Sequence, residues 1–110
     1  MSYKKEIEQW FAMTWGGGLI LPDGWFGRPY DNIHQLTRLD EDKGELCLVL
    51  DDGQLALRFF GAVQLSVDKN ELEISNFDRL EFNWKEYGTM TPHSDTYNSG
   101  FVKIVAPPGA

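Results

Sequence analysis

The chain has 110 residues, of which 42% are apolar and 25% are charged, and its formal net charge is −7. This length suits a single domain with its own core, and the composition is that of a folded protein rather than a disordered one. Because the excess of negative charge repels phosphate backbones and anionic lipid headgroups, we expect no binding to nucleic acids or membranes.

Cysteine usage and hydropathy favour the cytoplasm. Cys47 is the only cysteine, so no disulfide can form within the chain, which is usual for cytosolic proteins. No apolar stretch approaches the roughly 20 residues of a membrane span, and the first residues lack the apolar segment of a signal peptide. We therefore expect a cytoplasmic protein with one domain over residues 1–105 and a flexible tail over residues 106–110.

The first expected element is an amphipathic helix near the N-terminus. Large residues recur at helical spacing on one face, namely Tyr3, Ile7, Trp10, Phe11 and Thr14. Ser2 is placed to cap this helix, and the glycine triplet 16–18 is placed to end it. Since the triplet lacks the lysine of a P-loop, we interpret it as a helix terminator and hinge.

Beyond the triplet, apolar residues alternate with a period of two, which predicts strands. The expected strands cover residues 19–21, 33–39, 45–50, 54–60, 63–67, 71–75, 79–85 and 101–105. Asp52-Gly53 is a strong hairpin signal between two of them. The predicted fold is α+β, with the N-terminal helix packed on one curled, mainly antiparallel sheet of about seven strands. Edge strands around residues 63–75 leave a homodimer open.

Residues 21–34 form the most distinctive stretch of the sequence. Prolines and glycines stiffen it, and a stiff loop loses little entropy when it presents aromatic and arginine side chains to a partner. Residues 21–32, Leu-Pro-Asp-Gly-Trp-Phe-Gly-Arg-Pro-Tyr-Asp-Asn, resemble a motif in small bacterial proteins of unassigned function. Some of those proteins resemble immunity proteins of toxin systems, and the resemblance implies no catalytic residue.

The candidate binding residues lie in two polar segments. Residues 88–100 form a long connection that we expect to be an ordered loop. We expect Trp25 and Phe26 to fold inward as a plug over one end of the core, with the polar ends of residues 28–34 pointing outward. The candidates are Trp25, Arg28, Tyr30, Asp31, Asn32 and His34 in the first segment, and His93, Asp95 and Tyr97 in the second.

No catalytic or metal-binding constellation is recognisable in the sequence. His93, Ser94 and Asp95 are adjacent residues whose side chains point apart in an extended loop, and no glycine-flanked serine elbow is present. His34 and His93, with Asp23, Asp31 and Asp95, match no known ligand spacing. We interpret both histidines as hydrogen-bonded surface residues and expect no enzymatic activity, cofactor or metal.

These features favour a non-catalytic protein-binding module, for which an immunity-type inhibitor is one form. It would dock a basic partner protein through the 21–34 loop and the neighbouring acids. One alternative is a small-ligand binder with residues 88–100 as a lid over a sheet cavity, which would be lined by Phe59, Phe60, Phe82 and Trp84. Another is an enzyme in which His34 and His93 approach one another beside carboxylates.

Overall fold

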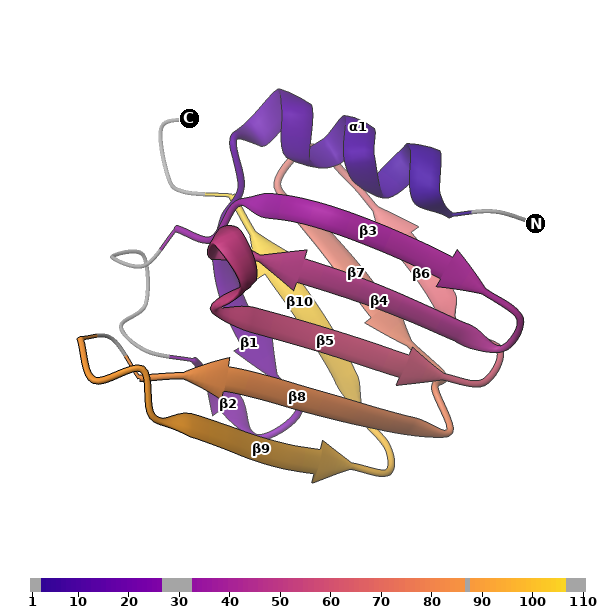
Figure 1. Ribbon diagram of the computed structural model, residues 1–110. Coiled ribbons are helices and arrows are strands. Elements are labelled where there is room, and N and C mark those ends of the chain that lie inside the picture. The colour runs from indigo at the N-terminus through magenta and orange to yellow at the C-terminus, as the bar shows by residue number, and fades with distance from the viewer. Residues whose placement is uncertain (1–2, 27–32, 87, 107–110) are drawn as a thin grey trace.

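The protein folds as two antiparallel sheets that face each other, with a helix at one side (Figure 1). The computed structural model describes residues 3–26, 33–86 and 88–106. Helix α1 spans Lys4–Thr14. The first sheet has the strand order β2-β1-β10-β7-β6, and the second has the order β3-β4-β5-β8-β9.

The first sheet contains β1 (Gly18–Leu21), β2 (Gly24–Trp25), β6 (Gln64–Val67), β7 (Glu71–Ser75) and β10 (Phe101–Val105). The second contains β3 (Leu36–Asp42), β4 (Glu45–Leu50), β5 (Leu55–Phe60), β8 (Arg79–Lys85) and β9 (Pro92–Tyr97). A short 3₁₀ turn, η1 (Asp51–Gly53), joins β4 to β5.

The α+β class and the antiparallel pairing are confirmed, but the prediction of one sheet of about seven strands is wrong. The structure has two sheets of five strands each. Alternation along a strand shows which side chains are buried, but it does not show which sheet the strand joins. Residues 92–97, expected to be part of a loop, form β9 instead.

The other expected elements largely match, with one shift. The strand expected over residues 33–39 begins at Leu36 and continues to Asp42, through the acidic residues that lie between the expected strands 33–39 and 45–50. Since β3 is an edge strand, its charged side chains can stay in solvent. The expected cap Ser2 and residues 107–110 of the expected tail lie outside the described residues.

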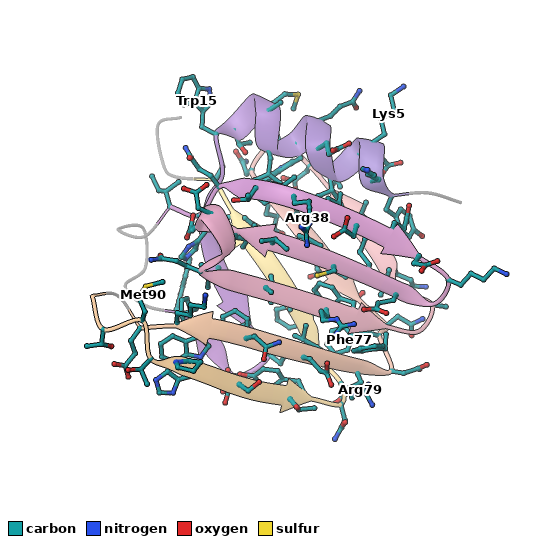
Figure 2. The ribbon with its side chains drawn as sticks, viewed as in Figure 1. Lys5, Trp15, Arg38, Phe77, Arg79 and Met90 are labelled. Carbon is teal, nitrogen blue, oxygen red and sulfur yellow. The ribbon has the colours of Figure 1, made fainter. Side chains whose placement is uncertain are left out.

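Helix α1 covers the side of the molecule where β3 and β6 form the edges of the two sheets (Figure 1). Its predicted apolar face is confirmed, because Ile7, Trp10 and Phe11 are buried. The Trp10 Nε1–H group donates to the carbonyl oxygen of Asp68, between β6 and β7, at 2.8 Å. Directly after the helix, Trp15 projects away from the molecule and is 77% exposed (Figure 2).

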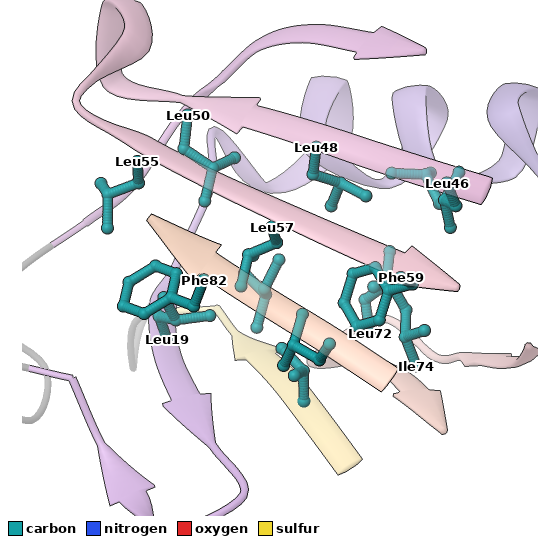
Figure 3. Packing of buried hydrophobic residues seen from close by; sticks show 14 of the residues in the cluster. Leu19, Leu46, Leu48, Leu50, Leu55, Leu57, Phe59, Leu72, Ile74 and Phe82 are labelled. Atoms are coloured by element: carbon teal, nitrogen blue, oxygen red, sulfur yellow. The ribbon is translucent and has the colours of Figure 1, made fainter. Parts of the chain in front are cut away.

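The core lies between the two sheets, where leucine, isoleucine and phenylalanine side chains from both layers meet (Figure 3). Leu57 and Phe82 of the second sheet and Ile74 of the first are fully buried. Phe59 also belongs to this core, whereas its neighbour Phe60 points to the opposite face under Arg79. The four rings of the alternative ligand cavity therefore do not line one space. The segment 88–100, named there as its lid, contains strand β9, which is paired with β8.

Gly17, the middle residue of the glycine triplet, lies where backbone segments come close together. Gly17 pairs with His34 as an isolated bridge, with the His34 N–H donating to the Gly17 carbonyl oxygen at 2.8 Å. A Cβ atom on Gly17 would lie 2.3 Å from the carbonyl oxygen of Val105. No side chain fits there, because the nearest atoms, the carbonyl group of Val105 and the nitrogen of Ala106, belong to the backbone.

Candidate functional site

The two segments selected from the sequence meet at one edge of the molecule. The Tyr97 hydroxyl, at the end of β9, donates to Asp23 Oδ1, between β1 and β2, at 3.2 Å. A Cβ atom on Gly100 would lie 2.9 Å from the side chain of Pro22, so the chain after β9 also lies against this turn. We call this surface the β2–β9 seam, formed by residues 22–26 on one side and by Trp84, Glu86, His93, Asp95 and Tyr97 on the other.

Aromatic rings close the seam from inside. Phe26 makes edge-to-face contacts with Phe82 and Trp84, with ring centroids 5.1 and 5.2 Å apart. Trp84 in turn stacks on His93 at 4.3 Å, with the ring planes 18° apart. Phe26 thus plugs one side of the core as predicted, whereas Trp25 is 36% exposed on the edge strand β2, so the predicted plug holds for only one of the two rings.

Three candidate residues share one face of β9. His93, Asp95 and Tyr97 are opposite Trp84, Phe82 and Leu80 of β8, respectively. Because side chains of directly paired residues lie on the same side of a sheet, the three residues project toward the space between the two layers at its open edge. The register of the β8–β9 pair is what brings them together.

Carboxylates line this edge. Glu86 Oε1 is 2.7 Å from His93 Nε2, and Asp95 Oδ2 accepts a hydrogen bond from Trp84 Nε1–H at 3.4 Å. Burial and the nearby charge of Asp23 raise the pKa of Tyr97 to about 12, so its hydroxyl stays a hydrogen-bond donor at neutral pH. The seam therefore combines two tryptophans, a histidine and a tyrosine with three acidic groups.

His34 is not a surface residue, which corrects the prediction. It is 6% exposed, and its Nδ1 atom is 2.6 Å from Asp51 Oδ2. Burial pushes the pKa of Asp51 upward, but hydrogen bonds from His34 and from the Gln35 N–H hold that pKa below its ordinary value. The backbone of His34 pairs with Gly17, and its imidazole lies against the ring of Phe26.

His34 also has a buried ring nitrogen without a partner. The other carboxylate oxygen of Asp51 accepts from the Gln35 N–H at 3.0 Å, so both oxygens are used. Since a carboxylate only accepts, the Nδ1 atom of His34 carries the hydrogen of the pair. Its Nε2 atom has no hydrogen-bond partner in the part of the chain that the structure describes.

Arg28, Tyr30, Asp31 and Asn32 lie outside the described residues. Asp51 and Glu86, the carboxylate partners of the two histidines, are not among the residues selected from the sequence. If the sequence had predicted that β8 and β9 pair as a hairpin, it would also have indicated Glu86. The pairing of Lys85 with Pro92 brings Glu86 near His93.

The two histidines occupy separate environments, each with its own carboxylate. Ring contacts run from His34 to Phe26 at 5.9 Å, from Phe26 to Trp84, and from Trp84 to His93. Within residues 3–26, 33–86 and 88–106, no group of three or more histidine, cysteine, aspartate or glutamate side chains could hold a metal ion. In the same ranges, no helix is both long and apolar enough to cross a membrane.

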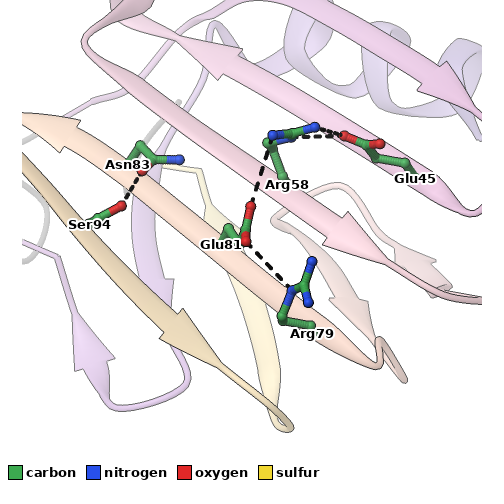
Figure 4. Close-up of polar contacts among 6 residues, drawn as sticks. All are labelled: Glu45, Arg58, Arg79, Glu81, Asn83 and Ser94. Carbon is green, nitrogen blue, oxygen red and sulfur yellow. Dashed lines mark hydrogen bonds and ion pairs between the residues drawn. The ribbon is translucent and has the colours of Figure 1, made fainter.

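On the outer face of the second sheet, acidic and basic side chains form ion pairs with one another (Figure 4). Arg58 pairs with Glu45 of β4 and, at 3.9 Å, with Glu81 of β8, and Arg79 lies 3.6 Å from the same Glu81. Asn83 accepts a hydrogen bond from Ser94 on the neighbouring strand. Acidic and basic groups alternate on this face, in contrast to the seam.

Comparisons with known proteins provide no relative. The chain matches no model of a protein family, and searches of curated proteins and of solved structures find no significant match.

Proposed function

We propose that the protein is a non-catalytic protein-binding module that docks a basic partner protein at the β2–β9 seam, in the manner of an immunity-type inhibitor. The hydrogen bond between Asp23 and Tyr97 carries the proposal, because it joins the two segments that the sequence selected independently. The seam then presents Trp25 and three carboxylates along one edge.

The chemistry of the seam suits a basic protein surface. Exposed aromatic side chains on a rigid backbone supply contact area at small entropic cost, and carboxylates at the rim steer a partner of opposite charge. Asp23 and Asp95 are both exposed, and the net charge of −7 adds a long-range attraction for a basic protein. Trp25 lies on strand β2 and Asp95 on strand β9, and main-chain pairing with β1 and β8 holds these two residues in place.

The test is affinity capture followed by quantitative binding. Wild-type protein is used as bait in extracts of its source cells, and captured proteins are identified by mass spectrometry. An Asp23→Lys/Asp95→Lys variant reverses two charges in the seam. We expect a basic protein that binds the wild type and whose affinity for the variant falls at least about tenfold, equal to 1.4 kcal/mol.

A matched control makes the same charge change elsewhere. Asp40→Lys/Asp42→Lys places two lysines on the exposed edge strand β3, at the opposite edge of the second sheet. Equal loss of binding in both variants would mean a response to net charge alone and would contradict the proposal. So would a captured partner whose affinity neither variant changes. Circular dichroism of both variants verifies that they are folded.

A further inference from the structure

Three neighbouring hollows share lining residues at one end of the second sheet, and we propose that together they form a groove that binds an extended basic segment of a partner protein. The inference rests on the proposed function in that the segment belongs to the same basic partner. The strand ends beside the groove, where β3, β5 and β9 begin and β4 and β8 end, lie at the left of the view (Figure 1). We call it the strand-end groove.

The groove consists of three hollows that share lining residues. Phe11, Trp15 and Leu36 line the first, between helix α1 and the start of β3. Leu36 and Gln35 also line the second, together with Asp52 and Gln54. Gln54 continues into the third hollow, beside Trp84 and His93 of the seam.

The length of the groove fits a short extended peptide. The five strand ends beside the second and third hollows lie side by side, and at about 4.8 Å per neighbour they span about 19 Å. An extended chain rises about 3.3 Å per residue, so about six residues cover that distance. The first hollow, between α1 and β3, extends the groove beyond the strand ends. The groove therefore suits a peptide segment rather than a single side chain.

The charged side chains that line the hollows indicate that the bound segment is basic. Glu8 lines the first hollow and Asp52 lines the second, and both side chains are exposed. Within the described contacts, neither carboxylate has an ion-pair or hydrogen-bond partner. Lys85 lines only the third hollow, so lysine or arginine side chains of the segment belong in the first and second.

Trp15 provides an apolar anchor at one end of the groove. It is 77% exposed and has a backbone φ of 65°, a conformation that costs a bulky residue about 1–2 kcal/mol. Glycine, which adopts this conformation freely, occupies the next position in the chain. A large side chain in this conformation, beside an open hollow lined by Phe11 and Leu36, is suited to hold an apolar side chain of the segment.

NMR titration with a defined peptide tests the inference. The probe is a peptide of about six residues that alternates lysine and leucine, matched in length to the row of five strand ends. We expect it to shift the amide resonances of Ala12, Leu36, Asp52 and Gln54, and we expect the same peptide with glutamate in place of lysine to shift none. A Glu8→Lys/Asp52→Asn variant should bind the lysine peptide at least about tenfold more weakly.

The control variant is Glu6→Lys/Asp42→Asn, which makes the same charge change on α1 and β3 but outside the groove. It should bind the peptide as the wild type does. Three results would each overturn the inference. They are resonance shifts spread over the whole surface, equal weakening of peptide binding in both variants, and groove shifts that change with the protein concentration but not with the peptide concentration. If seam-dependent capture of a basic partner succeeds while the groove gives no peptide shifts, the inference fails and the proposed function is unaffected.

Discussion

At the scale of single residues, two acid–ring pairs fix side chains in and beside the candidate site. Asp51 holds His34 in the interior, and Asp23 holds Tyr97 at the seam. In each pair a carboxylate accepts from a ring group that belongs to a segment distant in the sequence. Each pair also shifts a pKa, which makes the contacts measurable in solution.

Asp51→Asn should lower the free energy of unfolding by about 1–3 kcal/mol near neutral pH, because the buried His34 N–H loses its charged acceptor. The wild-type pKa of Asp51 is lowered, so this stabilisation is present above the unfolded-state value near 3.8 and is lost as the pH falls through the folded-state value. Urea unfolding across this pH range measures it. Asp52→Asn, also at positive φ, is the control and should change stability by less than about 0.5 kcal/mol.

Asp23→Asn should lower the pKa of Tyr97 from about 12 toward its ordinary value of 10.0. The NMR shift of the ring carbon that bears the hydroxyl reports the titration. Because the wild-type pKa is raised, Tyr97 contributes stability fully below pH 10.0, and this contribution disappears as the pH rises toward 12. Asp95→Asn should have the smaller effect, since Asp95 is the weaker cause. An unchanged Tyr97 titration in Asp23→Asn would contradict the assigned contact.

At the scale of elements, both edge strands of the second sheet, β3 and β9, have polar sequences that do not follow a regular apolar alternation. Strand β9 has the polar sequence Pro-His-Ser-Asp-Thr-Tyr, yet it pairs with β8 along its full length. An edge strand is held by main-chain hydrogen bonds on one side and does not need regular apolar alternation. The same reasoning explains why the acidic residues 40–42 belong to β3.

Gly17→Ala should lower the free energy of unfolding by about 3 kcal/mol, because the new Cβ atom would lie 2.3 Å from the Val105 carbonyl oxygen and the backbone must move. Gly44→Ala is the comparison. Gly44 has a φ of 67° but open space around it, so that substitution should cost only about 1–2 kcal/mol of backbone strain. Thermal and urea unfolding measure both; equal losses would show that the crossing at Gly17 can relax.

At the scale of the whole molecule, the two sheets share one core. Among the described residues, neither sheet has a core of its own. Leu57 and Ile74 belong to opposite sheets and are both completely buried in the same cluster. Helix α1 closes one side of this sandwich, and Phe26 with Trp84 closes the other. Each layer therefore depends on the other for burial of its apolar face.

Leu57→Ala and Ile74→Ala should each lower the free energy of unfolding by about 2–5 kcal/mol, because each leaves a cavity in the shared core. In both variants, tryptophan fluorescence and circular dichroism should change in one coincident transition. Two separate transitions would show that the sheets unfold independently. Val67→Ala, at a residue that is 41% exposed, is the control and should change little.

Sequence reasoning determined the helix, its buried face and most of the strands, including residues 101–105, because local hydrophobic period reports which side of a segment faces apolar surroundings. It also selected His93, Asp95 and Tyr97, although as residues of a loop. Only the tertiary structure decided the division into two sheets, the pairing of β9, the burial of His34 and the seam between Asp23 and Tyr97. These features depend on main-chain pairing and on contacts between segments far apart in the chain, and a local pattern carries no record of which distant segment completes it.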